Sequence, residues 1–284
     1  MDKLRVAAMR IRTQSLKGPS EFARVTAANG YDAVRAGCDL VVFPGGWGDG
    51  LQLDAGDEVS ADPPGLRLWE LYLDAGARAA RMAGSALVPG TIDLPLADER
   101  HATMAAVFGP DGTLWGQQQQ THRAAEDETL VAGETLEPVE TPLGRLGLLL
   151  GADSRYPEAA RILALKGVEV ILLPLQPRRP YSAERALVGA WQIAQQNLVA
   201  CVEAGRSDEG YEGRAAVTVP RSLSPDGSGF LPVAGYQVHD GALVADIPLE
   251  ALRELRARDP LASRLAPVVY RQHLPGLYRR RSRP

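Results

Sequence analysis

Short apolar segments with the spacing of strands alternate along this chain with segments whose apolar residues recur at helical spacing. In the first half, Leu4–Met9 and Leu40–Phe43 are predicted strands, and Glu21–Ala36 is the predicted helix between them. The second half repeats this order with a strand that ends at Leu150 and a helix over Pro157–Lys166. Because such alternation requires helices packed on sheets, two similar halves placed sheet to sheet predict an α/β fold, a four-layer α-β-β-α sandwich.

The remaining predicted elements continue this alternation. They are helices over Leu66–Met82, Ala183–Gln196 and Pro248–Arg258, and strands over Ala86–Val88, Thr103–Phe108, Thr113–Gln117, Val168–Leu173, Leu198–Ala204, Ala215–Pro220 and Val233–Val238. No break in composition divides the 284 residues, so we expect one domain over residues 1–284. Within it, residues 260–284 are rich in Pro and Arg and are expected to form a C-terminal tail along this subunit or another.

Composition excludes several classes of protein. The net charge is −4 with acidic and basic residues interspersed, so we expect no binding to nucleic acid or to an anionic membrane. No apolar run reaches the roughly 20 residues that span a bilayer, and no signal-peptide pattern follows Met1, so we expect a cytoplasmic protein. The two cysteines, Cys38 and Cys201, adjoin apolar runs and are predicted to be buried thiols. We expect neither a metal nor a cofactor.

The segment Gly147–Glu158 (GLLLGADSRYPE) ends a predicted strand and opens a helix. It resembles the nucleophile motif of the nitrilase, or carbon-nitrogen hydrolase, family. Where that family places its catalytic cysteine, this chain has Gly151. A glycine has no side chain that could attack a nitrile or amide carbon, so the resemblance implies that the family's thioester route is closed.

The resemblance continues along nearly the whole chain and covers the other two catalytic positions. After Leu40-Val-Val-Phe-Pro44 the family has a glutamate that serves as general base, and this chain has Gly45. The family's catalytic lysine stands two residues before a histidine, and here Gln120 stands two residues before His122. The resemblance therefore implies that the Glu-Lys-Cys triad is lost and that no residue is catalytic by the family mechanism.

Other polar residues are candidates for a pocket. His122 and Asp153 are expected near the old active site, where they either bind a ligand and activate water or hold the structure. Glu128 resembles an additional pocket glutamate of the family and either orients a ligand or caps a loop. Trp47 either fills the volume left by the lost side chains or offers a binding surface. Arg155, which belongs to the retained helix-opening pattern, and Gln176 complete the set of possible pocket residues.

Three functions remain open from the sequence. The first is a non-catalytic family member that binds a small amide, nitrile or carboxylate, or that serves as a partner subunit. The second is a carbon-nitrogen hydrolase that activates water at His122, Asp153 or Glu128. The third is an interaction protein whose pocket has filled in. The resemblance also implies a homodimer or a larger oligomer.

Overall fold

The computed structural model describes residues 1–52, 65–96, 98–125, 127–177, 183–232 and 239–279. Thirteen strands within these ranges form one mixed sheet, with a main path in the order β6-β7-β5-β3-β1-β12-β11-β10-β9. Its strands are β1 (Leu4–Ile11), β3 (Leu40–Val42), β5 (Ala86–Val88), β6 (Ile92–Pro95), β7 (His101–Phe108), β8 (Leu114–Gln119), β9 (Val139–Thr141), β10 (Gly144–Leu148), β11 (Val170–Leu175), β12 (Ala200–Arg206), β13 (Ala216–Thr218), β14 (Phe230–Leu231) and β15 (Gly241–Ile247). A separate pair is formed by β2 (Leu16–Lys17) and β4 (Leu51–Gln52).

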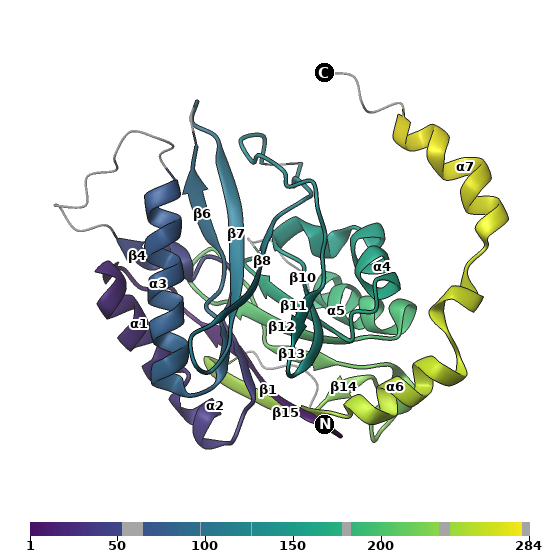
Figure 1. The fold of residues 1–284 in the computed structure, drawn as a ribbon, viewed down its shortest axis with the longest axis horizontal. Coiled ribbons are helices and arrows are strands. Elements are labelled where there is room, and N and C mark those ends of the chain that lie inside the picture. Colours follow the sequence, from purple (N-terminus) through teal and green to yellow (C-terminus); the bar gives the residue numbers. More distant parts are fainter. Residues whose placement is uncertain (53–64, 97, 126, 178–182, 233–238, 280–284) are drawn as a thin grey trace.

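Helices cover both outer faces of the curled sheet (Figure 1). The α-helices are α1 (Gly18–Asn29), α2 (Tyr31–Arg35), α3 (Leu66–Ala83), α4 (Pro157–Leu165), α5 (Ala183–Asn197), α6 (Leu249–Arg258) and α7 (Pro267–Arg279). The short 3-10 helices are η1 (Gly48–Gly50), η2 (Gly151–Arg155), η3 (Arg221–Leu223) and η4 (Leu261–Arg264). Helices α1 and α3 lie on the side of the first half, and α4 and α5 lie on the side of the second half (Figure 1).

Three buried clusters account for the layers. Alternate residues of β1 point to opposite faces, so Val6 packs in the central cluster between the two halves, whereas Met9 packs against α1 and α3. In the second half, Leu172 joins the central cluster and Ile171 packs with α4 and α5. The predicted four-layer α-β-β-α architecture is confirmed, and its two halves are continuous because Arg10 and Ile11 of β1 pair with β12.

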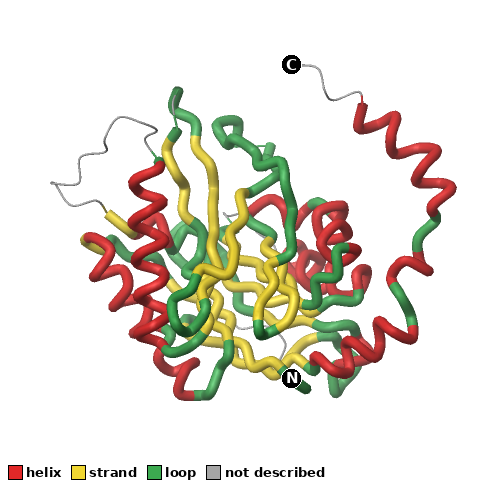
Figure 2. The backbone as a smooth tube through the Cα atoms, viewed as in Figure 1, coloured by secondary structure: helices red, strands yellow, loops and turns green. Residues whose placement is uncertain are grey.

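Several predicted elements have different bounds in the structure. The helix predicted over Glu21–Ala36 is divided at Gly30 into α1 and α2. The strands β2, β4, β6, β9, β14 and β15 and the helix α7 were not predicted, because they are short or lie near Pro, Gly or Arg clusters that obscure their pattern. The strand predicted over Val233–Val238 lies outside the described residues. The backbone drawn as a tube shows α7 leading away from the rest of the chain (Figure 2).

Candidate functional site

Gly151 is the first residue of η2 and follows shortly after the end of the β10 strand. Its φ is +48°, in the left-handed region that favours glycine. A Cβ at this position would collide with the side-chain oxygen of Gln120 and lie 3.1 Å from its Cδ. The structure therefore brings together Gly151 and Gln120, which the sequence resemblance aligned with the family's cysteine and lysine, and the Gln120 amide fills the space where a side chain at position 151 would start.

Hydrogen bonds hold both the backbone and the side chain of Gln120 in place. Strand β8 continues to Gln119, two residues beyond the predicted end, so Gln120 follows directly after the strand. Its backbone N–H donates to the Thr103 carbonyl at 2.9 Å, and its side-chain Nε2 donates to the His122 carbonyl at 2.8 Å. The side chain is buried, so these contacts fix its amide against Gly151.

Asp153 joins the end of β8 to the start of η2. Its Oδ1 accepts hydrogen bonds from the backbone N–H groups of Thr121 at 3.0 Å and His122 at 2.7 Å, and from the Thr121 hydroxyl at 2.8 Å. Its Oδ2 accepts the N–H of Leu150 at 3.2 Å. The carboxylate is fully buried, and these donors occupy both oxygens. We infer that Asp153 positions two segments of backbone.

The imidazole ring of His122 lies next to the Asp153 carboxylate. Its Nδ1 lies 3.0 Å from Asp153 Oδ1, and its ring stacks on Tyr156 with centroids 4.2 Å apart. The Tyr156 hydroxyl donates to the Arg123 carbonyl at 3.1 Å. The histidine side chain remains 29% exposed, so it can meet solvent or a ligand. A carboxylate-held histidine of this kind can serve as a general base or as a hydrogen-bond partner.

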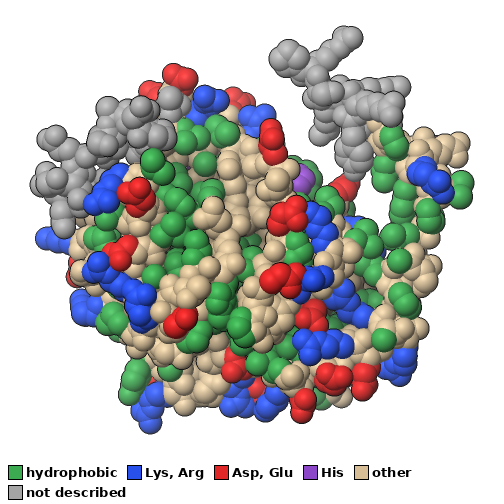
Figure 3. All heavy atoms as spheres, in the orientation of Figure 1, with side chains coloured by type: hydrophobic (Ala, Val, Ile, Leu, Met, Phe, Trp, Pro, Cys, Tyr) green, Lys and Arg blue, Asp and Glu red, His purple; other side chains and the backbone are tan. Residues whose placement is uncertain are grey.

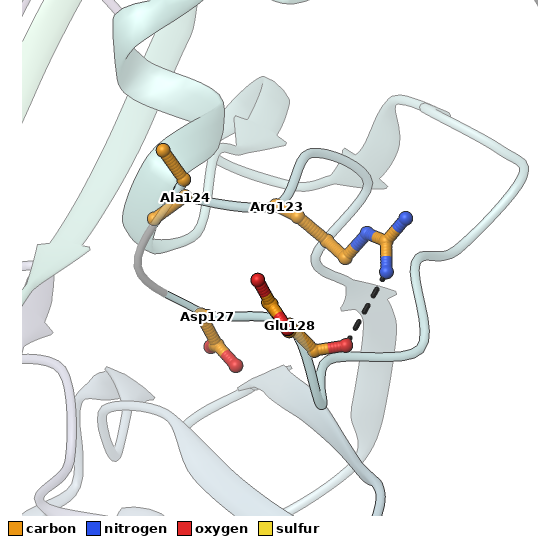
Figure 4. Close-up of a pocket in the computed structure, with 5 residues that line it drawn as sticks. Arg123, Ala124, Asp127 and Glu128 are labelled. Carbon is orange, nitrogen blue, oxygen red and sulfur yellow. Dashed lines mark hydrogen bonds between the residues drawn. The ribbon is translucent and has the colours of Figure 1, made fainter.

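A cavity of about 540 Å³ lies in the loop that follows His122 in the sequence. Its lining residues are Arg123, Ala124, Ala125, Asp127 and Glu128. Arg123 Nη1 donates to the backbone carbonyl of Glu128 at 3.3 Å, and the side chains of both residues border the open space (Figure 4). Glu128 was a predicted pocket residue, whereas Arg123 and Asp127 were missed because their loop carries no spacing pattern. The cavity offers one cationic and two anionic side chains.

Gly45 and Gln176 lie at the adjoining ends of β3 and β11. The Gly45 N–H donates to the Leu175 carbonyl at 3.1 Å, and a Cβ on Gly45 would lie 2.9 Å from the Leu175 carbonyl carbon. Backbone therefore occupies the place where a side chain at position 45 would begin. Gln176 Oε1 faces Gly46 and lies 3.4 Å from Nη1 of Arg206, whose guanidinium stacks over the Tyr211 ring at 4.0 Å.

Two further predicted pocket residues lie apart from the cavity. Trp47 is fully buried with α1, tilted against Phe43 at 5.3 Å, and its Nε1 donates to the Thr26 hydroxyl at 2.9 Å. Its indole fills the core of the first half. Arg155 lies at the end of η2 and is exposed.

The cysteines are also removed from the candidate site. Both thiols are buried, as predicted, and burial raises the pKa of Cys38 to about 11 and also raises the pKa of Cys201. The thiolate is the nucleophilic form, so neither residue is prepared for attack. No cluster of His, Cys, Asp and Glu suited to a metal ion occurs among the described residues. No described helix is long and apolar enough to cross a bilayer.

Known proteins resemble this chain in sequence and in architecture. The carbon-nitrogen hydrolase family profile matches residues 5–257. The omega-amidase NIT2 of Homo sapiens is 26% identical in an alignment 300 residues long, gaps included, which covers 98% of this chain and 98% of that one. A carbon-nitrogen hydrolase from Helicobacter pylori G27 has a TM-score of 0.74 at 22% identity, covering 96% of this chain and 98% of that one. Nit3 of Saccharomyces cerevisiae, a nitrilase-superfamily member, has a TM-score of 0.71 at 20% identity, covering 92% and 95%. This chain belongs to the carbon-nitrogen hydrolase family.

Proposed function

We propose that this chain binds a small molecule in the cavity that Arg123, Asp127 and Glu128 line, and that it does not hydrolyse this molecule by the family's cysteine route. One observation carries this proposal. Gly151 stands where the nucleophile would be, and the Gln120 amide occupies the space into which any side chain at position 151 would extend. Covalent catalysis requires an activated nucleophile in contact with the substrate, and glycine supplies none.

The two other family positions support the same conclusion. Gln120 carries no charge that would stabilise an oxyanion, and such electrostatic stabilisation commonly contributes more than any other effect to acyl-transfer catalysis. Gly45 carries no carboxylate to accept a thiol proton, and the backbone of β11 packs directly against it. A single reversion such as Gly151→Cys would therefore meet a steric conflict and would lack both the base and the cation.

The cavity in the loop after His122 supports the binding part of the proposal. Arg123 supplies a guanidinium that matches a carboxylate, and Asp127 and Glu128 supply acceptors for amide or ammonium N–H groups. Several curated relatives are named omega-amidases, so amides that also bear a carboxylate, and their acid products, are the ligands to test first.

Isothermal titration calorimetry with a panel of short ω-amides and the corresponding diacids tests this binding. We expect saturable binding that Glu128→Gln and Arg123→Gln each weaken about tenfold or more, because each removes one charged contact. His273→Ala, a change of an exposed residue on α7, is the matched control and should leave binding unchanged. If no ligand gave a binding signal, the result would contradict the proposal and would favour a partner-subunit role instead.

A second candidate function is hydrolysis of a carbon-nitrogen bond by water. The pairing of His122 Nδ1 with Asp153 favours it, because a carboxylate-held imidazole is a suitable general base. In that case His122→Ala should abolish ammonia release from an amide and Glu128→Gln should chiefly raise KM. Without the covalent intermediate and the oxyanion cation, any such activity should be orders of magnitude below that of an intact relative.

A further inference from the structure

His101, at the start of β7, holds residues 127–131 through both its backbone and its ring. Its backbone N–H donates to the Thr129 carbonyl at 3.1 Å, and its carbonyl accepts the Val131 N–H at 2.7 Å. Its Nδ1 lies 3.2 Å from the Thr129 hydroxyl, and its Nε2 lies 3.5 Å from Oδ2 of Asp127, which lines the cavity. A titratable ring on the sheet therefore contacts one of the charged groups of the cavity.

The hydrogen bonds around this ring assign its tautomer. The Thr129 hydroxyl donates its only proton to Oδ1 of Asp127 at 3.2 Å, so its oxygen accepts from Nδ1 of His101. The neutral ring therefore carries its proton on Nδ1, and the lone pair of Nε2 faces Oδ2 of Asp127. Because two acceptors form no hydrogen bond with each other, the neutral ring leaves Oδ2 open to a ligand.

A second proton on the ring changes this contact. It binds at Nε2, because Nδ1 is already protonated, and Nε2 then donates to Oδ2 of Asp127 as a charged group. The other carboxylate oxygen, Oδ1, already accepts the Leu130 N–H at 3.2 Å and the Thr129 hydroxyl. Protonation of His101 therefore occupies and neutralises the carboxylate that would otherwise accept an N–H group from a ligand.

Other charged groups surround His101. Asp49 of η1 interacts with its charge, and the Asp93 N–H of β6 donates to Asp49 at 2.8 Å. Arg100 precedes the histidine and pairs with Asp98 at 3.7 Å. Burial raises the pKa of Asp49 to about 6, so this carboxyl titrates in the same range as an ordinary histidine and requires a control. Acidic and basic side chains are interspersed over the face shown in Figure 3, so local contacts rather than a field of one sign decide the charge of the cavity.

We propose that His101 is a positioning residue that sets the ligand selectivity of the cavity, favouring an amide end when its ring is neutral and a second carboxylate when its ring is protonated. This inference rests on the proposed function, in which Arg123 binds a carboxylate that an ω-amide and its diacid share. The two ligands differ at the end that meets Asp127. An amide N–H donates to the open carboxylate, whereas a second carboxylate is repelled until His101 neutralises Asp127.

Isothermal titration calorimetry of the full chain with succinamate and with succinate, at about pH 8 and about pH 6, tests this selectivity. On going to the lower pH we expect the Kd of succinamate to rise and that of succinate to fall, each about two- to fivefold, as suits a partly exposed ion pair. His101→Asn keeps a donor for the Thr129 hydroxyl but takes up no proton, so it should retain the selectivity of pH 8 at both values. A purely structural role would weaken both ligands alike.

Two further variants identify the groups involved. Asp127→Asn removes the carboxylate through which His101 acts and should also abolish the opposite shifts. Asp49→Asn removes the other group that titrates in this range and should leave the shifts in place. Circular dichroism of each variant shows that it is folded. Titration of succinate itself is common to all variants, so it cancels in the comparison.

The outcomes separate this inference from the proposed function. Opposite shifts that persist in His101→Asn would overturn the inference and assign the titration to another group, such as His122. Binding of both ligands with the same pH dependence in the unmodified chain would overturn the inference alone, because the cavity would still bind. No binding of either ligand at either pH would overturn the proposed function, and the inference with it.

Discussion

Position 151 imposes two separate costs on any residue other than glycine. Its φ of +48° strains an L side chain, and the nearest atoms to a Cβ belong to Gln120. Gly84, at the end of α3, has a φ of +65° with no atom within 4 Å of its Cβ position. Substitutions at Gly84 and Gly151 can therefore separate the energetic cost of the left-handed backbone from the cost of the steric conflict.

Gly84→Ala should lower the free energy of unfolding by about 1 kcal/mol, the usual cost of a left-handed alanine. Gly151→Ala should lower it by about 2–3 kcal/mol, because crowding by Gln120 is added to the strain. Urea denaturation of the two variants measures both values. Adding Gln120→Ala should recover part of the loss in Gly151→Ala. Equal losses at the two glycines would contradict the steric conflict.

Sequence motifs predicted which residues occupy the three family positions, but they did not predict what surrounds those residues. The spacing between Gln120 and His122 and the pattern around Gly151 were sufficient to predict that these residues share one site. The contact between Gln120 and Gly151 depends on how far β8 extends and on a side-chain rotamer, neither of which periodicity determines. Arg123 and Asp127 were missed for a similar reason, because the course of their loop follows from tertiary contacts such as the Tyr156 hydrogen bond.

Strand β15 pairs with β1 in antiparallel orientation, and an exposed cluster of charged side chains reinforces this pairing. Arg5 Nε donates to Asp246 at 2.7 Å, and Lys3 donates to the same carboxylate at 2.9 Å. The hydrogen bond from Arg5 is the main reason that the pKa of Asp246 is lowered to about 2. Because the folded pKa lies below the unfolded value, the carboxylate stabilises the fold above about pH 4 and loses this effect as the pH falls towards 2.

Asp246→Asn should therefore lower Tm by about 1–3 °C at pH 7, with a difference that shrinks between pH 4 and pH 2. Differential scanning calorimetry across this range measures the difference. Asp98→Asn removes a carboxylate that is almost fully exposed and should show no comparable trend. A deficit for Asp246→Asn that stays constant down to pH 2 would exclude the ion cluster as its cause.

A buried ion pair links β12 to the segment before β13. Arg214 Nε donates to Glu203 Oε1 at 3.0 Å and Nη2 donates to Oε2 at 3.1 Å, with both side chains almost fully buried. Burial raises the pKa of Glu203, and the charge of Arg214 opposes that rise. Each charge is tolerated in the interior mainly because of the other.

Arg214→Met should lower the free energy of unfolding by about 3–5 kcal/mol, because it leaves Glu203 buried without a cation. The double variant Glu203→Gln/Arg214→Met removes both charges and should be less destabilised than the single variant. Guanidinium denaturation at pH 7 compares the two. A double variant that is the less stable of the two would show that hydrogen bonds, rather than the unpaired charge, dominate.

Elements with strong apolar patterns were predictable, whereas weak ones were not. The α3 helix and the β5 strand occur within one residue of their expected bounds, because burial of a continuous apolar face decides them. Helix α7 was missed because its composition resembles that of a solvated basic tail and because its apolar face has no covering surface within the described part of the chain.

The chain retains a carbon-nitrogen hydrolase fold, and we propose that it does so without the family's cysteine chemistry. Ammonia release from short ω-amides, measured against an omega-amidase as positive control, tests this proposal directly. We predict no protein-dependent release by the full chain, even for an amide that binds saturably. Protein-dependent, saturable release would contradict the proposal, and loss of that release in His122→Ala would assign the activity to water activated at the His122–Asp153 pair.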